Sequence, residues 1–542
     1  MNPVSRIFLL WGRQAGWMVF GAVLFLAALA AGLALMGASG RYIAFALLGG
    51  GVLVPAVLQY IGAARVVLRY LERVFTHEAM FRALAGLRIW LFTGLARSAA
   101  GGLGYRRAGD ALARLVNDVD ALDGLFLRIF LPLLGAVLLA PVLAVLLWRE
   151  QPWALAVLLP FGFVAFYLPA LAARAAGRNG ARAGLAMSGL RSAALDALSG
   201  LREVKIYAAE GRMLAAVQAR EASYLAAQRE LVKQTSALNA RAFLVAQAGL
   251  LLAMLAGLAG APVFTVITVF VLITVFETVL GLPRAGVLYG QARAAAARVV
   301  EAATALPAVA DPPAPAPMPA GNSVAFEHVS FRYADNLPFV FENLSLQLPA
   351  GSRTAILGPS GAGKSTIAAL LLKLVSPLSG QIRLGAADLA TLPSEAVRHR
   401  IAYLGQTTHL FADTIRNNLR LGDPTASEEK LWAALEAAQL AQTVMGLPEG
   451  LDTWLGEGGQ NLSGGQGRRL ALARTLLCEA PILLLDEPCA GLDADTESEF
   501  MKVLNTATQG RTVVLIAHRL TGVEQLDRIW RLAGGVLMPA AG

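Results

Sequence analysis

Long runs of apolar residues with few or no charges recur through the first half of the chain. The run at Gly16–Gly37 has no charged residue, and a helix of about 20 apolar residues can cross the hydrocarbon core of a bilayer. Five further runs share this pattern, at Tyr42–Gly62, Leu125–Trp148, Ala154–Ala173, Phe243–Leu258 and Val263–Leu282. The pattern predicts an α-helical membrane bundle of six transmembrane helices, with Arg41 in a tight outer loop between the first two.

Amphipathic segments between these runs predict helices that continue beyond the membrane. Arg65–Ala96 extends the second run, and Arg174–Arg241 is typical of two helical extensions with a turn between them. Both segments are basic, whereas the predicted outer loops hold only Arg41 and Arg149. Because cytoplasmic loops carry an excess of Lys and Arg, we place the long segments on the cytoplasmic side.

The N-terminal segment Asn2–Gln14 combines Arg6 and Arg13 with bulky apolar residues. This composition predicts a helix that lies in the membrane interface. A cleavable signal peptide is the alternative for the first apolar run, because small residues follow at Met36–Gly40. That run is longer than the core of an ordinary signal peptide and further spans follow it, so we expect a retained anchor.

The second half of the chain has a different pattern. From Ser323 onward apolar strands alternate with helical stretches, which predicts an α/β domain with a mainly parallel sheet. Leu306–Ala320 is rich in Pro and Ala and predicts an extended, semi-rigid linker. We therefore expect a transmembrane domain with cytoplasmic stalks at residues 1–305, a linker at 306–321 and the α/β domain at 322–542.

Composition agrees with a chain that is partly in lipid. Charged residues make up 15% of the chain and hydrophobic residues 56%, whereas soluble proteins have about 25% charged residues. The net charge of +9 is not concentrated on one face of a soluble domain, so we expect no nucleic-acid partner. Two cysteines, Cys478 and Cys489, are too few for a disulfide framework and indicate a reducing compartment.

A glycine-rich loop at Gly358–Thr366 reads GPSGAGKST and fits the P-loop pattern G-x-x-x-x-G-K-[ST]. The apolar run Arg353–Leu357 before it and the amphipathic run after it predict a strand, loop and helix, in which backbone N–H groups cradle phosphates. Lys364 would bind the β- and γ-phosphates and Ser365 would bind Mg²⁺. The predicted ATP-binding residues of this loop are Gly358, Pro359, Ser360, Gly361, Ala362, Gly363, Lys364, Ser365 and Thr366.

A second apolar strand, Pro481–Pro488, ends in two acids. Ligands collect at the carboxyl ends of parallel strands, so we expect Asp486 to hold Mg²⁺ through water and Glu487 to act as the general base. Gln406 closes the strand IAYLGQ and is a candidate for contact with Mg²⁺ and with the membrane domain.

Two further residues are candidates near the nucleotide. His518 closes the strand at Val513–His518 and is a candidate for contact with the γ-phosphate, and Tyr333 is a candidate for stacking on adenine. For Gln406, His518 and Tyr333 an ordinary structural role remains the alternative.

The stretch Leu462–Gln466 reads LSGGQ and precedes a helical run. It predicts a second glycine-rich anion site at a helix N-terminus. Because one nucleotide needs only one P-loop, this second site implies a nucleotide that is held by a partner.

The P-loop, Gln406, LSGGQ, LLLDEP, the AGLD turn at Ala490–Asp493 and His518 together resemble the ATPases of ABC transporters. In that family two ATPase domains enclose two ATP molecules between them. The resemblance implies that Ser463, Gly464, Gly465, Gln466 and Asp493 contact the ATP of a partner chain. One set of six spans with one ATPase domain implies a half-transporter that works as a dimer.

The membrane half resembles the exporter type of this family. Gly109–Asp123 and Ala197–Glu210 resemble its cytoplasmic coupling segments. Three stretches, Arg69–Leu84, Gln406–Leu421 and His518–Ile529, resemble the CydC family of bacterial half-transporters. That resemblance implies a heterodimer with a CydD-like partner in the bacterial cytoplasmic (inner) membrane, ATPase domain in the cytoplasm, and export of glutathione or cysteine in support of cytochrome bd assembly.

The resemblance also implies a link to haem, with Arg73 and His77 as haem-contacting residues. Arg65, Arg69, Arg73 and His77 are spaced four residues apart, so they form one stripe on a helix. Such a stripe would attract the carboxylates of glutathione or the propionates of haem, and a neutral imidazole can ligate iron. A solvated stalk face is the alternative.

Two further residues leave alternatives open. Glu277 lies near the end of the sixth span, where a carboxylate pairs with a cation or contacts the amine of a thiol peptide; we favour pairing. Cys489 stands where the family usually has Thr or Ser, and we favour a small buried residue over a redox role. For the whole protein the alternatives are a homodimeric lipid or drug exporter and a non-transporting, haem-binding assembly factor or regulator.

Overall fold

The computed structural model describes residues 2–47, 55–98, 114–150, 152–257, 262–407, 409–489 and 494–540. These residues form two compact units, which are described separately. The first contains long helices from residues 2–96 and 114–305, and the second is the α/β unit at 306–540. The AGLD turn at Ala490–Asp493 lies outside the described residues, and so do residues 109–113 at the start of the predicted coupling segment Gly109–Asp123.

The first unit is entirely helical within the described residues. Six of its helical stretches are long and apolar enough to cross a membrane, which confirms the predicted number. Its α-helices are α1 (Pro3–Leu10), α2 (Ala15–Leu47), α3 (Pro55–Ser98), α5 (Leu131–Glu150), α6 (Leu158–Gly162), α7 (Leu168–Ser199), α8 (Leu201–Ile206), α9 (Glu210–Gly257), α10 (Pro262–Val279) and α11 (Leu282–Ala303). Tighter or wider helical turns occur at Trp11–Gln14, Arg114–Asp118, Leu125–Phe130, Pro152–Val157 and Phe163–Tyr167.

The predicted outer loop at Arg41 is wrong. Helix α2 continues through Arg41 to Leu47, and the next helix begins at Pro55. Residues 42–47 contain no Gly or Pro that would break a helix, and the Arg41 guanidinium lies 5.5 Å from the centre of the Phe45 ring, one turn further along α2. A single arginine therefore marks a polar position on a helix here, and not a turn.

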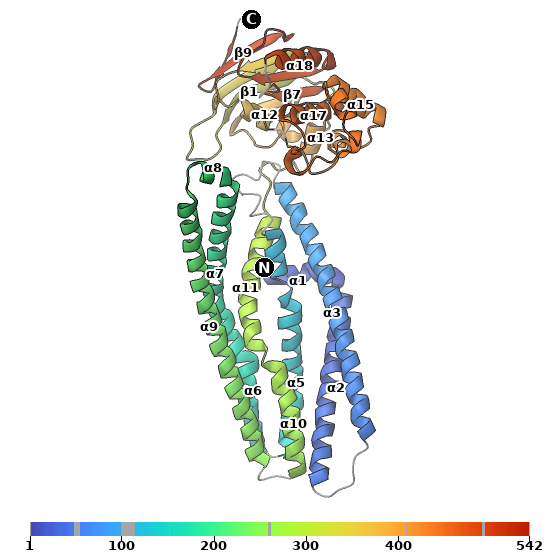
Figure 1. The fold of residues 1–542 in the computed structure, drawn as a ribbon, viewed down its shortest axis with the longest axis vertical. Coiled ribbons are helices and arrows are strands. Elements are labelled where there is room, and N and C mark those ends of the chain that lie inside the picture. Colours follow the sequence, from blue (N-terminus) through green and yellow to red (C-terminus); the bar gives the residue numbers. More distant parts are fainter. Residues whose placement is uncertain are drawn as a thin grey trace. The chain divides into compact units, whose positions relative to one another are not determined.

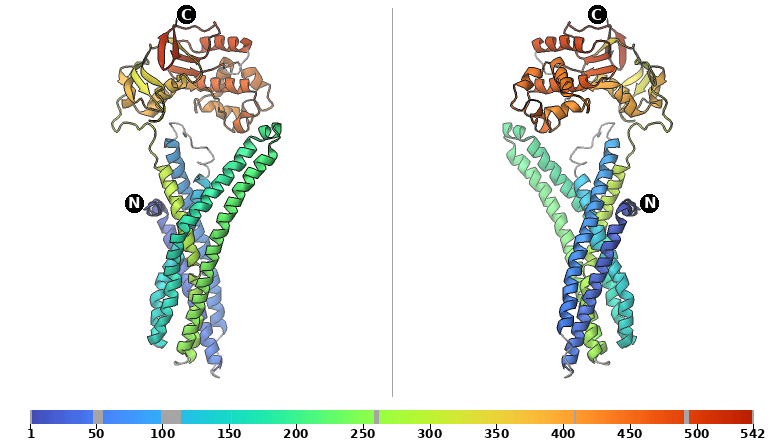
Figure 2. Two further views of the ribbon diagram at one scale, coloured as in Figure 1. Left: turned by 90° about the vertical axis from the view of Figure 1, so that its left-hand side faces the viewer. Right: turned by 90° about the vertical axis from the view of Figure 1, so that its right-hand side faces the viewer.

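The basic segment after the fourth span forms two long helices, as predicted. α7 and α9 run side by side and are joined by the short helix α8 (Figures 1 and 2). At this turn Leu201 and Ile206 expose 51% and 68% of their surface. The predicted second coupling segment therefore presents apolar side chains at the far end of the α7–α9 pair.

Close helix contacts within this unit depend on glycine. A Cβ on Gly94 of α3 would lie 2.2 Å from the carbonyl oxygen of Ala303, the last residue of α11. α11 also binds the Arg114–Asp118 turn, because Arg298 donates two hydrogen bonds, of 2.9 and 2.6 Å, to the Asp118 carboxylate. α3, α11 and this turn are thus fixed together.

The N-terminal helix α1 begins with Asn2, whose side chain accepts a hydrogen bond of 3.2 Å from the Val4 N–H. Ile7 and Trp11 are buried in the helical core, whereas Leu9 is 68% exposed. The apolar residues of this segment are therefore divided between the core and the surface, as an interfacial helix requires.

The second unit is built on two sheets. The larger has six strands in the order β10-β9-β3-β8-β7-β6, and all but β10 are parallel. The smaller is antiparallel, in the order β2-β1-β4-β5. The strands are β1 (Val324–Phe331), β2 (Phe341–Leu348), β3 (Arg353–Leu357), β4 (Ser379–Leu384), β5 (Ala387–Asp388), β6 (Ile401–Leu404), β7 (Ile482–Asp486), β8 (Thr512–Ala517), β9 (Arg528–Ala533) and β10 (Val536–Pro539).

Apolar residues dominate the central strands. All five residues of β7 are buried, as expected for a strand that is covered on both faces of a parallel sheet. The helices of this unit are α12 (Lys364–Leu371), α13 (Ser394–His399), α14 (Ile415–Arg420), α15 (Glu428–Ala437), α16 (Ala441–Met445), α17 (Gly464–Leu477) and α18 (Ala494–Ala507).

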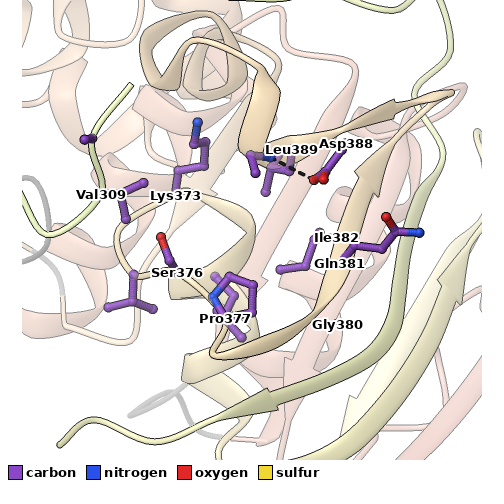
Figure 3. A pocket seen from close by; sticks show the side chains of 13 residues that line it. Val309, Lys373, Ser376, Pro377, Gly380, Gln381, Ile382, Asp388 and Leu389 are labelled. Atoms are coloured by element: carbon purple, nitrogen blue, oxygen red, sulfur yellow. Dashed lines mark hydrogen bonds between the residues drawn. The ribbon is translucent and has the colours of Figure 1, made fainter. Parts of the chain in front are cut away.

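The Pro/Ala-rich linker has no helix or strand between residues 305 and 323, and it is attached to the α/β unit. The Asp311 carboxylate accepts hydrogen bonds from the Ser394 N–H (2.8 Å) and hydroxyl (2.5 Å) at the start of α13. Val309 forms one wall of a cavity of about 260 Å³, with Lys373 and the end of β4 on other sides (Figure 3). The linker therefore follows the surface of this unit.

Candidate ATP-binding and hydrolysis site

The P-loop lies between β3 and α12, as the sequence predicts, and two of its glycines are sterically required. Gly363 has φ +97°, and a Cβ there would lie 2.5 Å from a Val340 methyl group. A Cβ on Gly358 would lie 2.4 Å from the Leu532 carbonyl oxygen. The loop can therefore approach the neighbouring backbone closely and turn its N–H groups inward.

Lys364 is the first residue of α12 and is only 5% exposed. Its ammonium group donates to the carbonyl oxygens of Gly358 (2.8 Å) and Pro359 (3.0 Å) within the same loop. Burial lowers the pKa of Lys364, although the nearby carboxylates of Glu487 and Asp486 act in the opposite direction. The cation is thus held inside the loop, where the phosphates of a nucleotide would lie.

Asp486 ends β7 and is 1% exposed. Neither of its carboxylate oxygens has a hydrogen-bond partner among the described residues. Burial raises the pKa of Asp486. The nearby Ser365 hydroxyl acts in the opposite direction and lowers this pKa in part, although it does not form a hydrogen bond of normal geometry with the carboxylate. A buried carboxylate without a partner, beside a hydroxyl, is a donor set that Mg²⁺ prefers.

Glu487, Gln406 and His518 come from three neighbouring strands and meet at the carboxyl edge of the sheet. The Gln406 amide nitrogen donates to one oxygen of the Glu487 carboxylate (2.9 Å), and His518 Nε2 lies 2.6 Å from the other. His518 Nδ1 lies 3.1 Å from the carbonyl oxygen of Gly358 in the P-loop. The structure therefore brings these three predicted side chains together beside Lys364.

Arg468 belongs to the same site, although the sequence analysis did not include it. It lies on α17, is 5% exposed, and donates to the carbonyl oxygens of Gln406 (2.6 Å), Asp486 (3.1 Å), Glu487 and Pro488 (2.8 Å). Its position two residues after LSGGQ was the only signal in the sequence, because all four partners come from distant segments.

Tyr333 follows β1 and is 56% exposed. Its hydroxyl lies 3.1 Å from the Thr366 hydroxyl in α12. This contact ties the aromatic ring to the helix that carries the P-loop lysine. A 56% exposed ring next to the P-loop remains free to stack on a base.

The LSGGQ segment forms the N-terminus of α17. The Ser463 hydroxyl accepts from the Gln466 N–H (3.3 Å) and the Gln466 side chain accepts from the Ser463 N–H (2.8 Å), which is a capping box. Ser463 and Gly464 are exposed, and Gly465 is partly exposed. Within the described residues, no hydrogen bond links Ser463 or Gln466 to the P-loop of the same chain.

The predicted stripe on α3 is largely exposed. Arg69, Arg73 and His77 are exposed, whereas the Arg65 side chain packs close to Gly32 of α2. His77 Nδ1 lies 2.8 Å from the Arg73 carbonyl oxygen. Because a carbonyl oxygen only accepts, Nδ1 carries the hydrogen in this contact and Nε2 is left as the position for a ligand.

Glu277 and Cys489 complete the predicted candidates. Glu277 is exposed, and no ion pair of this carboxylate occurs among the described residues, so the structure gives no partner for the favoured pairing role.

Burial raises the pKa of the Cys489 thiol to about 12. A thiol with so high a pKa is not a reactive thiolate, which agrees with a packing role.

Comparisons with known proteins match both halves of the chain. The ABC transporter transmembrane region matches residues 18–282, and the ABC transporter family matches residues 341–490. A bacterial Atm1-family ABC exporter, solved with ATP bound, superposes with a TM-score of 0.87 at 26% identity, over 97% of this chain and 94% of that chain.

Three curated relatives show how far the similarity extends. The glutathione/L-cysteine transport system ATP-binding/permease protein CydC of Escherichia coli is 32% identical, over 99% of this chain and 96% of its own length. The corresponding CydD of Bacillus subtilis is 31% identical, over 89% of this chain and 85% of its own length. An ATP-dependent lipid A-core flippase of Desulfotalea psychrophila is 38% identical, but over 48% of this chain and 45% of its own length.

Full-length similarity, six apolar helices and an ATPase unit with an intact P-loop agree with one another. The chain is therefore a multi-pass membrane protein that belongs to the ABC transporter family, as an ATP-hydrolysing exporter in which one transmembrane region and one ATPase domain are fused.

Proposed function

We propose that this chain is one half of a heterodimeric exporter that moves glutathione or cysteine across the bacterial cytoplasmic membrane, with its ATPase domain in the cytoplasm. The observation that supports this most is the similarity to a CydC protein over 99% of the chain. The lipid A-core flippase relative aligns over 48% of the chain, so it supports the shared machinery more than a lipid substrate. Export of a thiol would support the assembly of cytochrome bd.

The geometry of the site supports the hydrolytic roles that we propose for its residues. Lys364 binds the β- and γ-phosphates, and P-loop N–H groups surround them. Glu487 accepts a proton from the attacking water, while Gln406 and His518 orient its carboxylate through the contacts of 2.9 and 2.6 Å. When nucleotide binds, His518 is placed to contact the γ-phosphate because its ring already reaches the P-loop at Gly358.

A magnesium ion fits the residues that are present. Ser365, Asp486 and the side-chain oxygen of Gln406 would hold it, because the Gln406 nitrogen is already used by Glu487. The ion supplies positive charge that neutralises the phosphate oxygens in the transition state.

The proposed partner is a second, CydD-like half-transporter. Ser463 and Gly464 are exposed at the start of a 14-residue helix, where N–H groups and the helix dipole favour an anion. The nucleotide that the P-loop of the same chain would bind does not require Ser463 or Gly464. We propose that Ser463, Gly464, Gly465, Gln466 and Asp493 complete the site of the ATP held by the partner.

The proposed substrate contacts lie on α3. The exposed guanidinium groups of Arg69 and Arg73 suit the carboxylates of glutathione or the propionates of haem. His77 has Nε2 available as a ligand, which favours haem as a second candidate, either as cargo or as an effector. Glu277 lies on α10, and for this carboxylate pairing with a cation stays the favoured proposal, with contact to the substrate amine as the alternative.

The test is transport by the co-expressed pair in inverted membrane vesicles. We expect ATP-dependent uptake of labelled glutathione or cysteine by the wild type and none with Glu487→Gln. Arg73→Ala and His77→Ala should weaken uptake or remove haem absorbance, whereas the same change at Arg229, an exposed arginine of α9 outside the predicted coupling segments, should affect neither. ATP hydrolysis without uptake of either thiol or of haem would contradict the proposed export.

A further inference from the structure

Arg468 is a buried cation in an unusual setting. Its guanidinium donates to backbone carbonyl oxygens only: those of Gln406, Asp486, Glu487 and Pro488. Among the described residues no carboxylate forms an ion pair with it. Because burying a charge is costly unless it is well hydrogen-bonded, these four carbonyl contacts must compensate it.

The backbone that Arg468 contacts is strained. Glu487 has φ +49°, in the left-handed region that non-glycine residues rarely adopt. Such a conformation is unfavourable and persists only where the surrounding structure fixes it. The Glu487 N–H donates to the Ile516 carbonyl oxygen at 2.8 Å. Arg468 binds the carbonyl groups of Asp486, Glu487 and Pro488, so it holds the backbone on both sides of Glu487.

The same guanidinium also reaches Gln406, whose side chain binds the Glu487 carboxylate. One side chain therefore holds the backbone of both residues in the Gln406–Glu487 hydrogen bond. A lysine could not replace it, because an ammonium group lacks the planar fork with five N–H donors.

We infer that Arg468 is a positioning residue for ATP hydrolysis: it holds Glu487 and Gln406 in the geometry that water activation needs. It acts from α17, the helix that begins at the LSGGQ segment, so the position of that helix is fixed to the position of the general base. This inference rests on the proposed role of Glu487 as the base.

The test compares four variants of the co-expressed pair by ATP turnover, ATP affinity and thermal unfolding. Arg468→Lys keeps the charge but loses the fork, and we expect kcat to fall roughly 10- to 100-fold, the size of effect that a misplacement of about 1 Å produces. ATP affinity should change by less than about threefold, because the P-loop is untouched. Arg468→Gln should behave in the same way and serves if the lysine variant does not fold.

Arg469→Lys is the matched control. This neighbouring arginine donates to the Gln439 carbonyl oxygen (3.1 Å), away from Glu487, so its variant should keep the wild-type kcat. The inference is overturned if Arg468→Lys keeps its kcat, or if kcat and ATP affinity fall in parallel, as a general structural defect would produce. Glu487→Gln separates the role of Glu487 as the base from the positioning role of Arg468. Turnover by Glu487→Gln would show that Glu487 is not the base. If Glu487→Gln is inactive while Arg468→Lys is fully active, only the positioning role is rejected.

Discussion

At the scale of residues, the hydrolytic site is held ready by contacts within one domain. The carboxylate of Glu487 is fixed by Gln406 and His518, and the ammonium group of Lys364 is fixed by two P-loop carbonyl groups. The groups that we propose to act on the γ-phosphate are therefore oriented by the domain itself. Such preorganisation leaves less rearrangement for the reaction step.

Glu487→Gln should abolish turnover without loss of ATP binding. The amide cannot accept the proton of the attacking water, and general-base catalysis contributes about 10²- to 10⁴-fold. Lys364 and the P-loop are unchanged, so ATP affinity should stay close to that of the wild type. Steady-state hydrolysis and equilibrium nucleotide binding on the same preparation check this, and a variant with normal turnover would exclude Glu487 as the base.

The pH dependence of ATP binding should reflect Lys364. Burial lowers its pKa from the ordinary 10.5 in the nucleotide-free protein, whereas bound phosphates favour the charged ammonium. Binding therefore takes up protons on the alkaline side, and affinity should fall as pH rises through the lowered pKa. Nucleotide titrations across alkaline pH measure this, and an affinity that is constant up to pH 10.5 would contradict it.

Gly363→Ala should destabilise the protein more than Gly351→Ala. Both positions have positive φ, +97° and +75°, but only a Cβ at Gly363 meets another group, Val340 at 2.5 Å. The control therefore measures the conformational cost alone, about 1–2 kcal/mol, and the difference measures the steric cost. Thermal unfolding of the detergent-solubilised protein should show a larger decrease for Gly363→Ala. Equal decreases would show that the close contact relaxes freely.

At the scale of elements, the sequence correctly predicted features that depend on residues close together in the chain. The number of membrane spans and the P-loop depend on residues that are close in the sequence, and both predictions are confirmed. The bounds of the second span were wrong, because residues 42–47 belong to α2 and α3 begins at Pro55. The outer loop at Arg41 was wrong because one charged residue does not end a helix. Arg468 was missed because its partners, Gln406 and Asp486–Pro488, are brought to it only by the parallel sheet.

The linker also has contacts that its local sequence does not predict. Its composition predicted an extended segment, but the hydrogen bonds from Ser394 to Asp311 join residues 83 positions apart. Neither the anchor nor the φ of +49° at Glu487 has a signal in the local sequence. Both depend on tertiary packing.

Asp311→Ala should release the linker from α13. The helix loses the acceptor for the Ser394 N–H, a loss of about 1 kcal/mol for a helix cap, and protease cleavage within residues 306–321 should become faster. Asp335→Ala removes an acid that is 97% exposed and pairs, among the described residues, with Arg332, so it should leave cleavage unchanged. Equal cleavage of all three proteins would show that Asp311 is not an anchor.

Acidification should act on the same anchor. Burial raises the pKa of Asp311, but the two hydrogen bonds from Ser394 outweigh it and the pKa is lowered below 3.8. The stabilisation is therefore present above pH 3.8 and is lost as pH falls through the lowered pKa. Cleavage of the wild-type linker by an acid-active protease should increase in that range, whereas the Asp311→Ala variant should show no such step.

At the scale of the whole molecule, the chain carries two different parts of an ATP site. The P-loop, Asp486 and Glu487 are joined by contacts within the domain, whereas exposed Ser463 and Gly464 have no hydrogen bond to that P-loop among the described residues. This separation is why we propose that a partner completes each site. Turnover should then require both chains, and the chain expressed alone should hydrolyse ATP slowly.

The most direct measurement of this claim is thiol cross-linking between the two chains. Ser463→Cys would be combined with Cys478→Ser, Cys489→Ser and Glu487→Gln, and co-expressed with the CydD-like partner carrying one cysteine in its P-loop. With a cross-linker long enough to span a triphosphate, we predict a linked heterodimer in ATP and little or none in ADP or without nucleotide. Absence of the cross-link in every nucleotide state would contradict the shared ATP site.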